Sequence, residues 1–126
     1  MNWILVAAGG ASGALARYGL GILSGRTLGT ALPYGTFIAN LSGGLLMGLL
    51  AGWLAFKGGA DQERWRVLLG VGVLGGYTTF SAFSLETALM IERKEWGVAL
   101  GYALVSVVAS VGALFIGLFL SRRLFA

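Results

Sequence analysis

The chain has 126 residues, of which 57% are hydrophobic and 11% charged, and its mean hydropathy is +0.85. A soluble domain carries about a quarter of its residues charged, so the composition excludes a soluble globular protein and predicts a membrane protein. The net charge of +4 does not indicate a nucleic-acid partner, because the basic residues stand singly at the ends of apolar runs, as expected at membrane edges.

Four apolar segments predict a single domain, residues 1–126, that is all α-helical and crosses the membrane four times. A transmembrane helix needs about 20 apolar residues, and the predicted spans are 3–23, 33–56, 65–91 and 96–120. Tryptophans mark the span ends, where indole rings favour the headgroup level: Trp3, Trp53, Trp65 and Trp96. The first run lacks the basic region of a cleaved signal peptide, so we expect it to be retained.

The third span contains a candidate interruption. Gly70, Gly72, Gly75 and Gly76 precede Thr78, Thr79, Ser81 and Ser84, which combines poor helix formers with side chains that bond locally to the backbone. We predict a helix break near Gly75 and Gly76, and the alternative is a continuous glycine-rich helix. Most other glycines, such as Gly9 and Gly13, are expected at close helix contacts.

Asn40 is the most polar residue of the second span, with Thr36 one turn earlier on the same face. Burying an amide without a partner costs a few kcal/mol. Asn40 is therefore expected to face either a neighbouring helix or a water-filled path.

Phe80 and Phe83 share a face of the third span among hydroxyl side chains. A phenyl ring is positive at its edge, so edge-on rings can stabilise a small anion without a fixed charge. The alternative is that both rings face lipid or the core.

Tyr102, Ser106 and Ser110 form a polar line on one face of the fourth span. The line is expected either to border an ion path or to bond back to its own helix.

Two charged side chains fall within the spans. Arg17 either extends to the interface or draws anions into a vestibule. Glu86 is a functional candidate because intramembrane carboxylates are costly, although its position also permits contact with the interface.

Three segments resemble the signature segments of the Fluc/CrcB fluoride channels, and the likeness covers nearly the whole chain. They are Gly9–Gly19 (GGASGALARYG), Gly35–Gly44 (GTFIANLSGG) and Gly75–Ser84 (GGYTTFSAFS). The resemblance implies passive fluoride export through a dual-topology antiparallel homodimer in the cell inner membrane, with two pores and a structural sodium ion at the dimer centre. The chain departs from the family pattern at two positions. It has Ala82 where the family often has Thr or Ser, and Leu114 where some members have a polar residue.

The same resemblance implies roles for individual residues. Phe80, Phe83 and Asn40 would line the pore, and the Gly75 and Thr78 carbonyls would bind sodium. Arg17 would lie in a vestibule. Further pore-lining positions are Thr79, Ser81, Ser84, Tyr102, Ser106 and Ser110.

Three other readings compete with a channel. A small proton-coupled multidrug antiporter needs a carboxylate in the first span, which has none. An enzyme is disfavoured because no His or Cys is present and no base lies at nucleophile-activating spacing. A glycine-zipper oligomer explains the small residues but not Asn40 with the Phe80–Phe83 segment.

Overall fold

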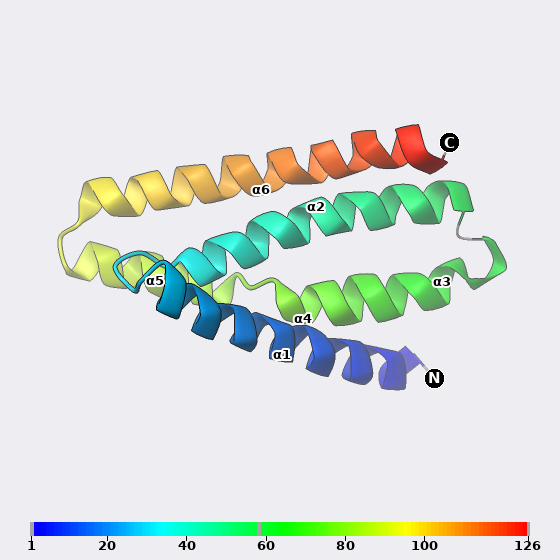
Figure 1. Ribbon diagram of the computed structural model, residues 1–126, viewed down its shortest axis with the longest axis horizontal. Coiled ribbons are helices and arrows are strands. Elements are labelled where there is room, and N and C mark those ends of the chain that lie inside the picture. Colours follow the sequence, from blue (N-terminus) through cyan, green and yellow to red (C-terminus); the bar gives the residue numbers. More distant parts are fainter. Residues whose placement is uncertain (1, 58, 126) are drawn as a thin grey trace.

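The computed structural model describes residues 2–57 and 59–125, and nearly all of them are helical (Figure 1). Two long helices come first, and short helices follow in the third segment before a long final helix. The bounds are α1 Asn2–Thr27, α2 Tyr34–Lys57, η1 Gly59–Asp61, α3 Gln62–Trp65, η2 Arg66–Leu74, α4 Gly75–Tyr77, α5 Ser81–Glu92 and α6 Trp96–Phe125.

Three of the described helical segments are long and apolar enough to cross a membrane: Tyr34–Lys57, Gly59–Glu92 and Trp96–Phe125. The predicted all-helical membrane protein is therefore confirmed. α1 has 26 residues, which is sufficient length for a span, but it is less apolar than the others. The membrane crossing by α1, the first predicted span, therefore stays a prediction.

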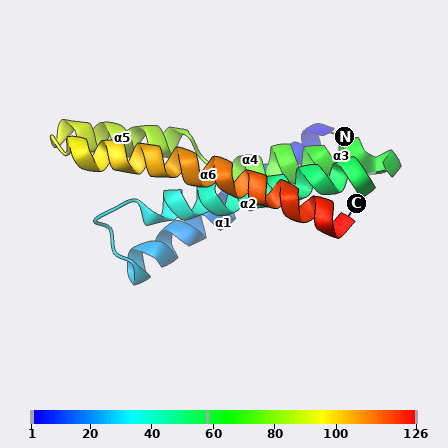
Figure 2. The same ribbon diagram turned by 90° about the horizontal axis from the view of Figure 1, so that it is seen from above.

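The helices pack as two pairs, and glycines bring the helices of each pair close together. α2 lies along α6, and α1 lies along η2 and α4, as the two views in Figures 1 and 2 show. A Cβ placed on Gly9 would lie 2.9 Å from the Cα of Gly72, and one on Gly48 would lie 3.0 Å from the Cα of Gly117. The predicted role of these glycines as close contacts is confirmed.

The third segment is interrupted, but at residues 78–80 rather than at the two glycines. Gly75 and Gly76 remain helical in α4, and Gly76 packs so tightly on α1 that a Cβ would lie 2.5 Å from the carbonyl oxygen of Gly10. Thr78 leaves the helix with φ −84° and ψ 158°. The predicted position was wrong because both glycines stay helical and Gly76 serves helix contact, while hydrogen bonds to side chains end the helix.

A second feature of this segment was not predicted. Residues Arg66–Leu74 form a π-helix, a rare geometry that usually occurs as single turns near functional sites. The backbone N–H of Gly75 donates to the carbonyls of Gly70 and Gly72 at its end. The wide turns therefore lead directly into α4 and the interruption.

Candidate functional site

An open groove of about 380 Å³ lies where α2, the interruption, α5 and α6 meet. It brings together seven of the site residues that the sequence predicted: Asn40, Thr78, Thr79, Phe80, Phe83, Ser106 and Ser110. Gly43, Gly44 and Met47 of α2 and three apolar side chains of α6 complete its lining. Residues separated by up to 70 positions in the chain thus share one surface.

Asn40 is bonded to the interrupted backbone at both of its amide atoms. Its Nδ2 donates to the carbonyl oxygen of Thr79 at 3.0 Å, and its Oδ1 accepts the N–H of Thr79 at 2.9 Å. The side chain therefore replaces helical hydrogen bonds that the interruption removes. An amide nitrogen carries two hydrogens, so one remains for a ligand in the groove.

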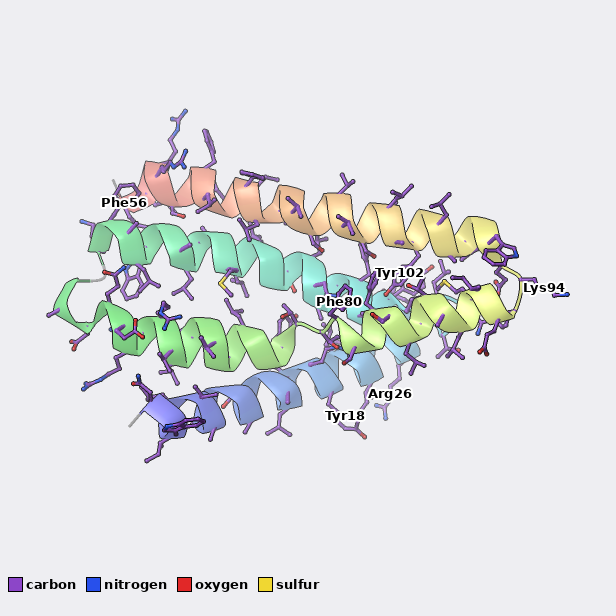
Figure 3. All side chains as sticks on the ribbon, turned by 180° about the vertical axis from the view of Figure 1, so that it is seen from behind. Tyr18, Arg26, Phe56, Phe80, Lys94 and Tyr102 are labelled. Carbon is purple, nitrogen blue, oxygen red and sulfur yellow. The ribbon has the colours of Figure 1, made fainter. Side chains whose placement is uncertain are left out.

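Two phenyl rings form the α5 side of the groove. The centroids of Phe80 and Phe83 are 5.7 Å apart, and the ring of Phe83 lies 5.2 Å from that of Tyr102. Phe80 is 78% exposed and lies beside the interruption (Figure 3). The exposed ring has not been absorbed into the core of this chain, and it is available to whatever fills the groove.

Ser106 supplies a buried hydroxyl on the opposite wall. It is 5% exposed, and its Oγ has no hydrogen-bond partner among residues 2–57 and 59–125. Other serines, such as Ser24, donate to the carbonyl four residues earlier. Ser106 therefore does not bond back to its own helix, and an unsatisfied buried hydroxyl beside a groove favours a ligand or water there.

A second cavity, of about 310 Å³, lies between the end of α1, residues 28–33, the start of α2, and α5. Figure 2 shows α1 and α2 diverging from α5 and α6 at this end. Arg17, Thr36 and Glu86 are among its lining residues, and the vestibule role of Arg17 stays a prediction.

These three side chains form a chain of hydrogen bonds with Tyr102. Arg17 Nη2 donates to Thr36 Oγ1 at 2.7 Å, and Thr36 donates to Glu86 Oε2 at 2.8 Å. The hydroxyl of Tyr102 donates to Glu86 Oε1 at 2.9 Å. The network joins α1, α2, α5 and α6, and Thr36 at its centre is 1% exposed.

Sequence reasoning left Glu86 open and gave Thr36 no role of its own. The only signal for Glu86 was a carboxylate within an apolar span. Its partner Thr36 lies 50 residues earlier, so no local pattern links the two residues.

Three predicted pore residues lie outside the groove lining. Ser81 and Ser84 are exposed on α5, and the Oγ of Ser81 lies 3.2 Å from Oγ1 of Thr79. Tyr102 lines a neighbouring apolar cavity of about 250 Å³ and reaches the network through its hydroxyl. The groove therefore gathers part of the predicted set.

The family model described as "CrcB-like protein, Camphor Resistance (CrcB)" matches residues 4–118. The chain belongs to the CrcB family. The match spans α1 to most of α6 and includes every residue that lines the groove.

Curated relatives match over almost their whole length. A protein of Phenylobacterium zucineum (strain HLK1) is 65% identical over 98% of this chain and 97% of its own length. One of Caulobacter sp. (strain K31) is 63% identical over 98% of this chain and 96% of its own. Both are named "Fluoride-specific ion channel FluC". The relatives of this CrcB chain are thus named as ion channels and not as enzymes.

The backbone at the interruption fits the sodium ion that the family resemblance implies. Thr79 gives its N–H to Asn40, and Ala82 gives its N–H to Thr79 Oγ1. These are the N–H groups that a continuous helix would direct to the carbonyls of Gly75 and Thr78. Both carbonyls thus lose their regular donors, and such neutral oxygens fit a hard cation.

Proposed function

We propose that this CrcB-family chain forms a fluoride-selective channel that exports fluoride passively and so lowers its cytoplasmic concentration. The observation that carries the proposal is the groove, where the Asn40 amide, the Phe80 and Phe83 rings and the unpartnered hydroxyl of Ser106 converge. The printed name of the relatives supports the choice of fluoride as the ion.

The energetics of a small anion agree with this lining. Moving a bare ion into a low-dielectric medium costs tens of kcal/mol, whereas a hydrogen bond to a charged group contributes roughly 1.5–3 kcal/mol. Several donors, ring edges and water must therefore act together along the path. The described residues that line the groove include no charged side chain, so an anion is stabilised without being trapped by a fixed cation.

The vestibule supplies the charge that the groove lacks. Arg17 attracts anions from solution, while its hydrogen bond to Thr36 holds the guanidinium outside the groove. Thr79 contributes to the groove, and Ser110 extends its donor line along α6. Ser81, Ser84 and Tyr102 are assigned to the approaches.

The working unit that we propose is an antiparallel homodimer of four-span chains in the cell inner membrane, with two pores. The open side of the groove supports it, since an exposed Phe80 and unsatisfied polar groups would be closed off by a second copy. With two subunits related by a twofold axis, each groove is completed by its partner.

At the centre of that dimer we propose a structural sodium ion held by the Gly75 and Thr78 carbonyls of both chains. Four neutral oxygens suit a hard monovalent cation, and no step of fluoride movement passes through it. An experimental structure with density only for water at the crossing would contradict this assignment.

The test of function is efflux from loaded proteoliposomes, followed with a fluoride electrode and, in parallel, a chloride electrode. We expect rapid fluoride release with little chloride release. Equal release of the two ions would contradict the selectivity. Proton flux driven by a lipophilic cation, without fluoride release, would favour the antiporter instead.

A further inference from the structure

Tyr77, the last helical residue before the interruption, is bonded to α2 through its hydroxyl. The hydroxyl oxygen lies 2.9 Å from Oγ of Ser42, and that Oγ lies 2.6 Å from the carbonyl oxygen of Ile38. A serine hydroxyl has one hydrogen, and here it is donated to Ile38. Tyr77 is therefore the donor and Ser42 the acceptor.

This bond is one of three adjacent contacts between α2 and the interruption. Asn40 binds the backbone of Thr79, Ser42 binds the side chain of Tyr77, and Gly43 lies against Thr78, whose Cγ2 would overlap a Cβ at position 43. We call these three α2 residues the break seat. Three consecutive residues of the third segment are thus fixed by one short stretch of α2.

The break seat acts on a helix that is short and has little intrinsic stability. α4 has three residues, two of which are glycines with little helix propensity. The carbonyls of Gly75 and Thr78 flank Tyr77, so rotation of α4 at this residue moves both oxygens. The Tyr77 bond is the one side-chain hydrogen bond that joins α4 to α2 among the described residues.

We propose that Tyr77 and Ser42 are a positioning pair that holds α4 so that the Gly75 and Thr78 carbonyls converge on the central cation. The inference rests on the proposed function, in particular on the sodium ion. Tyr77 and Ser42 act through the backbone and do not themselves contact the cation.

The experiment is equilibrium binding of radioactive sodium to the purified full-length protein, with Tyr77→Phe, Ser42→Ala and the double variant. We expect each to raise the sodium Kd about three- to tenfold, the usual effect of one hydrogen bond. The double variant should match the single ones, because all three lack the same bond. Ser42→Thr, unlike Ser42→Ala, keeps the hydroxyl, so its sodium Kd should stay near that of the unaltered protein.

Matched controls remove the same groups elsewhere. Tyr18→Phe removes an exposed phenol hydroxyl on α1, and Ser12→Ala removes an exposed serine that bonds back to Ala8. Both should leave the Kd unchanged. A purely structural role of Tyr77 would lower the number of sodium sites per protein without changing their Kd.

An unchanged Kd in Tyr77→Phe, a loss only in site number, or additive effects in the double variant would each overturn the proposal. Failure of the unaltered protein to bind sodium would also overturn it. Fluoride efflux measured in parallel separates the two proposals: efflux without sodium binding leaves the channel standing, and the expected Kd shifts without efflux leave the positioning pair standing.

Discussion

Asn40 combines two tasks in a single amide group. One hydrogen of Nδ2 and the acceptor Oδ1 satisfy the Thr79 backbone, while the second hydrogen remains for the groove. Under the proposed function, stability and transport depend on the same side chain, so both the free energy of unfolding and the fluoride efflux of an Asn40 variant are measured.

Replacing Asn40 by Leu keeps a similar volume and leaves the Thr79 N–H and carbonyl without their partner. Each unsatisfied group costs about 1–3 kcal/mol, so with two such groups we expect the free energy of unfolding to fall by roughly 2–6 kcal/mol. The measurement is a denaturant titration in mixed micelles, with Ser12→Ala as a surface control. A change below about 0.5 kcal/mol would show that other groups satisfy the Thr79 backbone.

Replacing Phe80 or Phe83 by Ile keeps apolar bulk and removes the ring quadrupole. We expect fluoride efflux to fall about tenfold, the change that a barrier increase of about 1.4 kcal/mol produces. Phe115→Ile alters an exposed ring of α6 outside the groove and should leave efflux unchanged. Normal efflux from both groove variants would mean that the rings serve packing alone.

At the scale of helices, close backbone contact determines how the members of each packed pair meet. α1 approaches η2 and α4 at Gly9 and Gly13, and α2 approaches α6 at Gly48. In lipid such contacts gain van der Waals packing that larger side chains would prevent. The loss of stability on replacing a glycine by a larger residue therefore depends on the helix face on which the glycine lies.

Gly13→Ala and Gly10→Ala make the same change on α1 with opposite expected results. A Cβ at Gly13 would lie 2.8 Å from the backbone nitrogen of Tyr77, whereas one at Gly10 has nothing within 4 Å. We expect Gly13→Ala to lower the Tm, because overpacking costs about 1–3 kcal/mol of the free energy of unfolding. Gly10→Ala should leave the Tm unchanged or raise it, and equal losses at both sites would argue against the α1 contact.

The helices were predictable from the sequence, but their interior details were not. Apolar runs and tryptophans located three segments that the structure confirms as long apolar helices, and the glycines of α1 and α2 were correctly assigned to contacts. The interruption was misplaced because its cause, the bond between Asn40 and Thr79, joins residues 39 positions apart. The Thr36–Glu86 bond escaped prediction for the same reason. The π-helix escaped it because apolar periodicity reports which residues share a face and not a local widening of the turns.

At the scale of the whole molecule, the two ends of the bundle differ little in basic charge. The end of α2, the start of the third segment and the end of α6 lie at the end that holds the N-terminus, and the end of α1 and the α5–α6 connection lie at the other (Figure 1). The first group carries Lys57, Arg64, Arg66, Arg122 and Arg123, and the second carries Arg26, Arg93 and Lys94. Because Lys and Arg near span ends set orientation, five against three is a weak bias. Both orientations are therefore expected in one membrane.

Adding two or three lysines at one end should force a single orientation and abolish fluoride efflux. Co-expression with a copy biased the other way should restore it, because an antiparallel pair forms again. The chain has no native cysteine, so Leu124→Cys provides a single label site for an impermeant thiol reagent in intact cells. Uniform labelling or uniform protection of the unbiased protein would contradict dual topology.

The bond between Asn40 and Thr79 also bears on the order of synthesis. Asn40 precedes its partner by 39 residues, so α2 leaves the ribosome before the interrupted segment does. When Thr79 is synthesised, the amide that satisfies its backbone has therefore already been made. In a chain rearranged to make the third segment first, the Thr79 backbone would wait for its partner, and in hydrocarbon unsatisfied backbone groups cost several kcal/mol. The N-to-C order of the helices thus supplies the partner before the groups that need it.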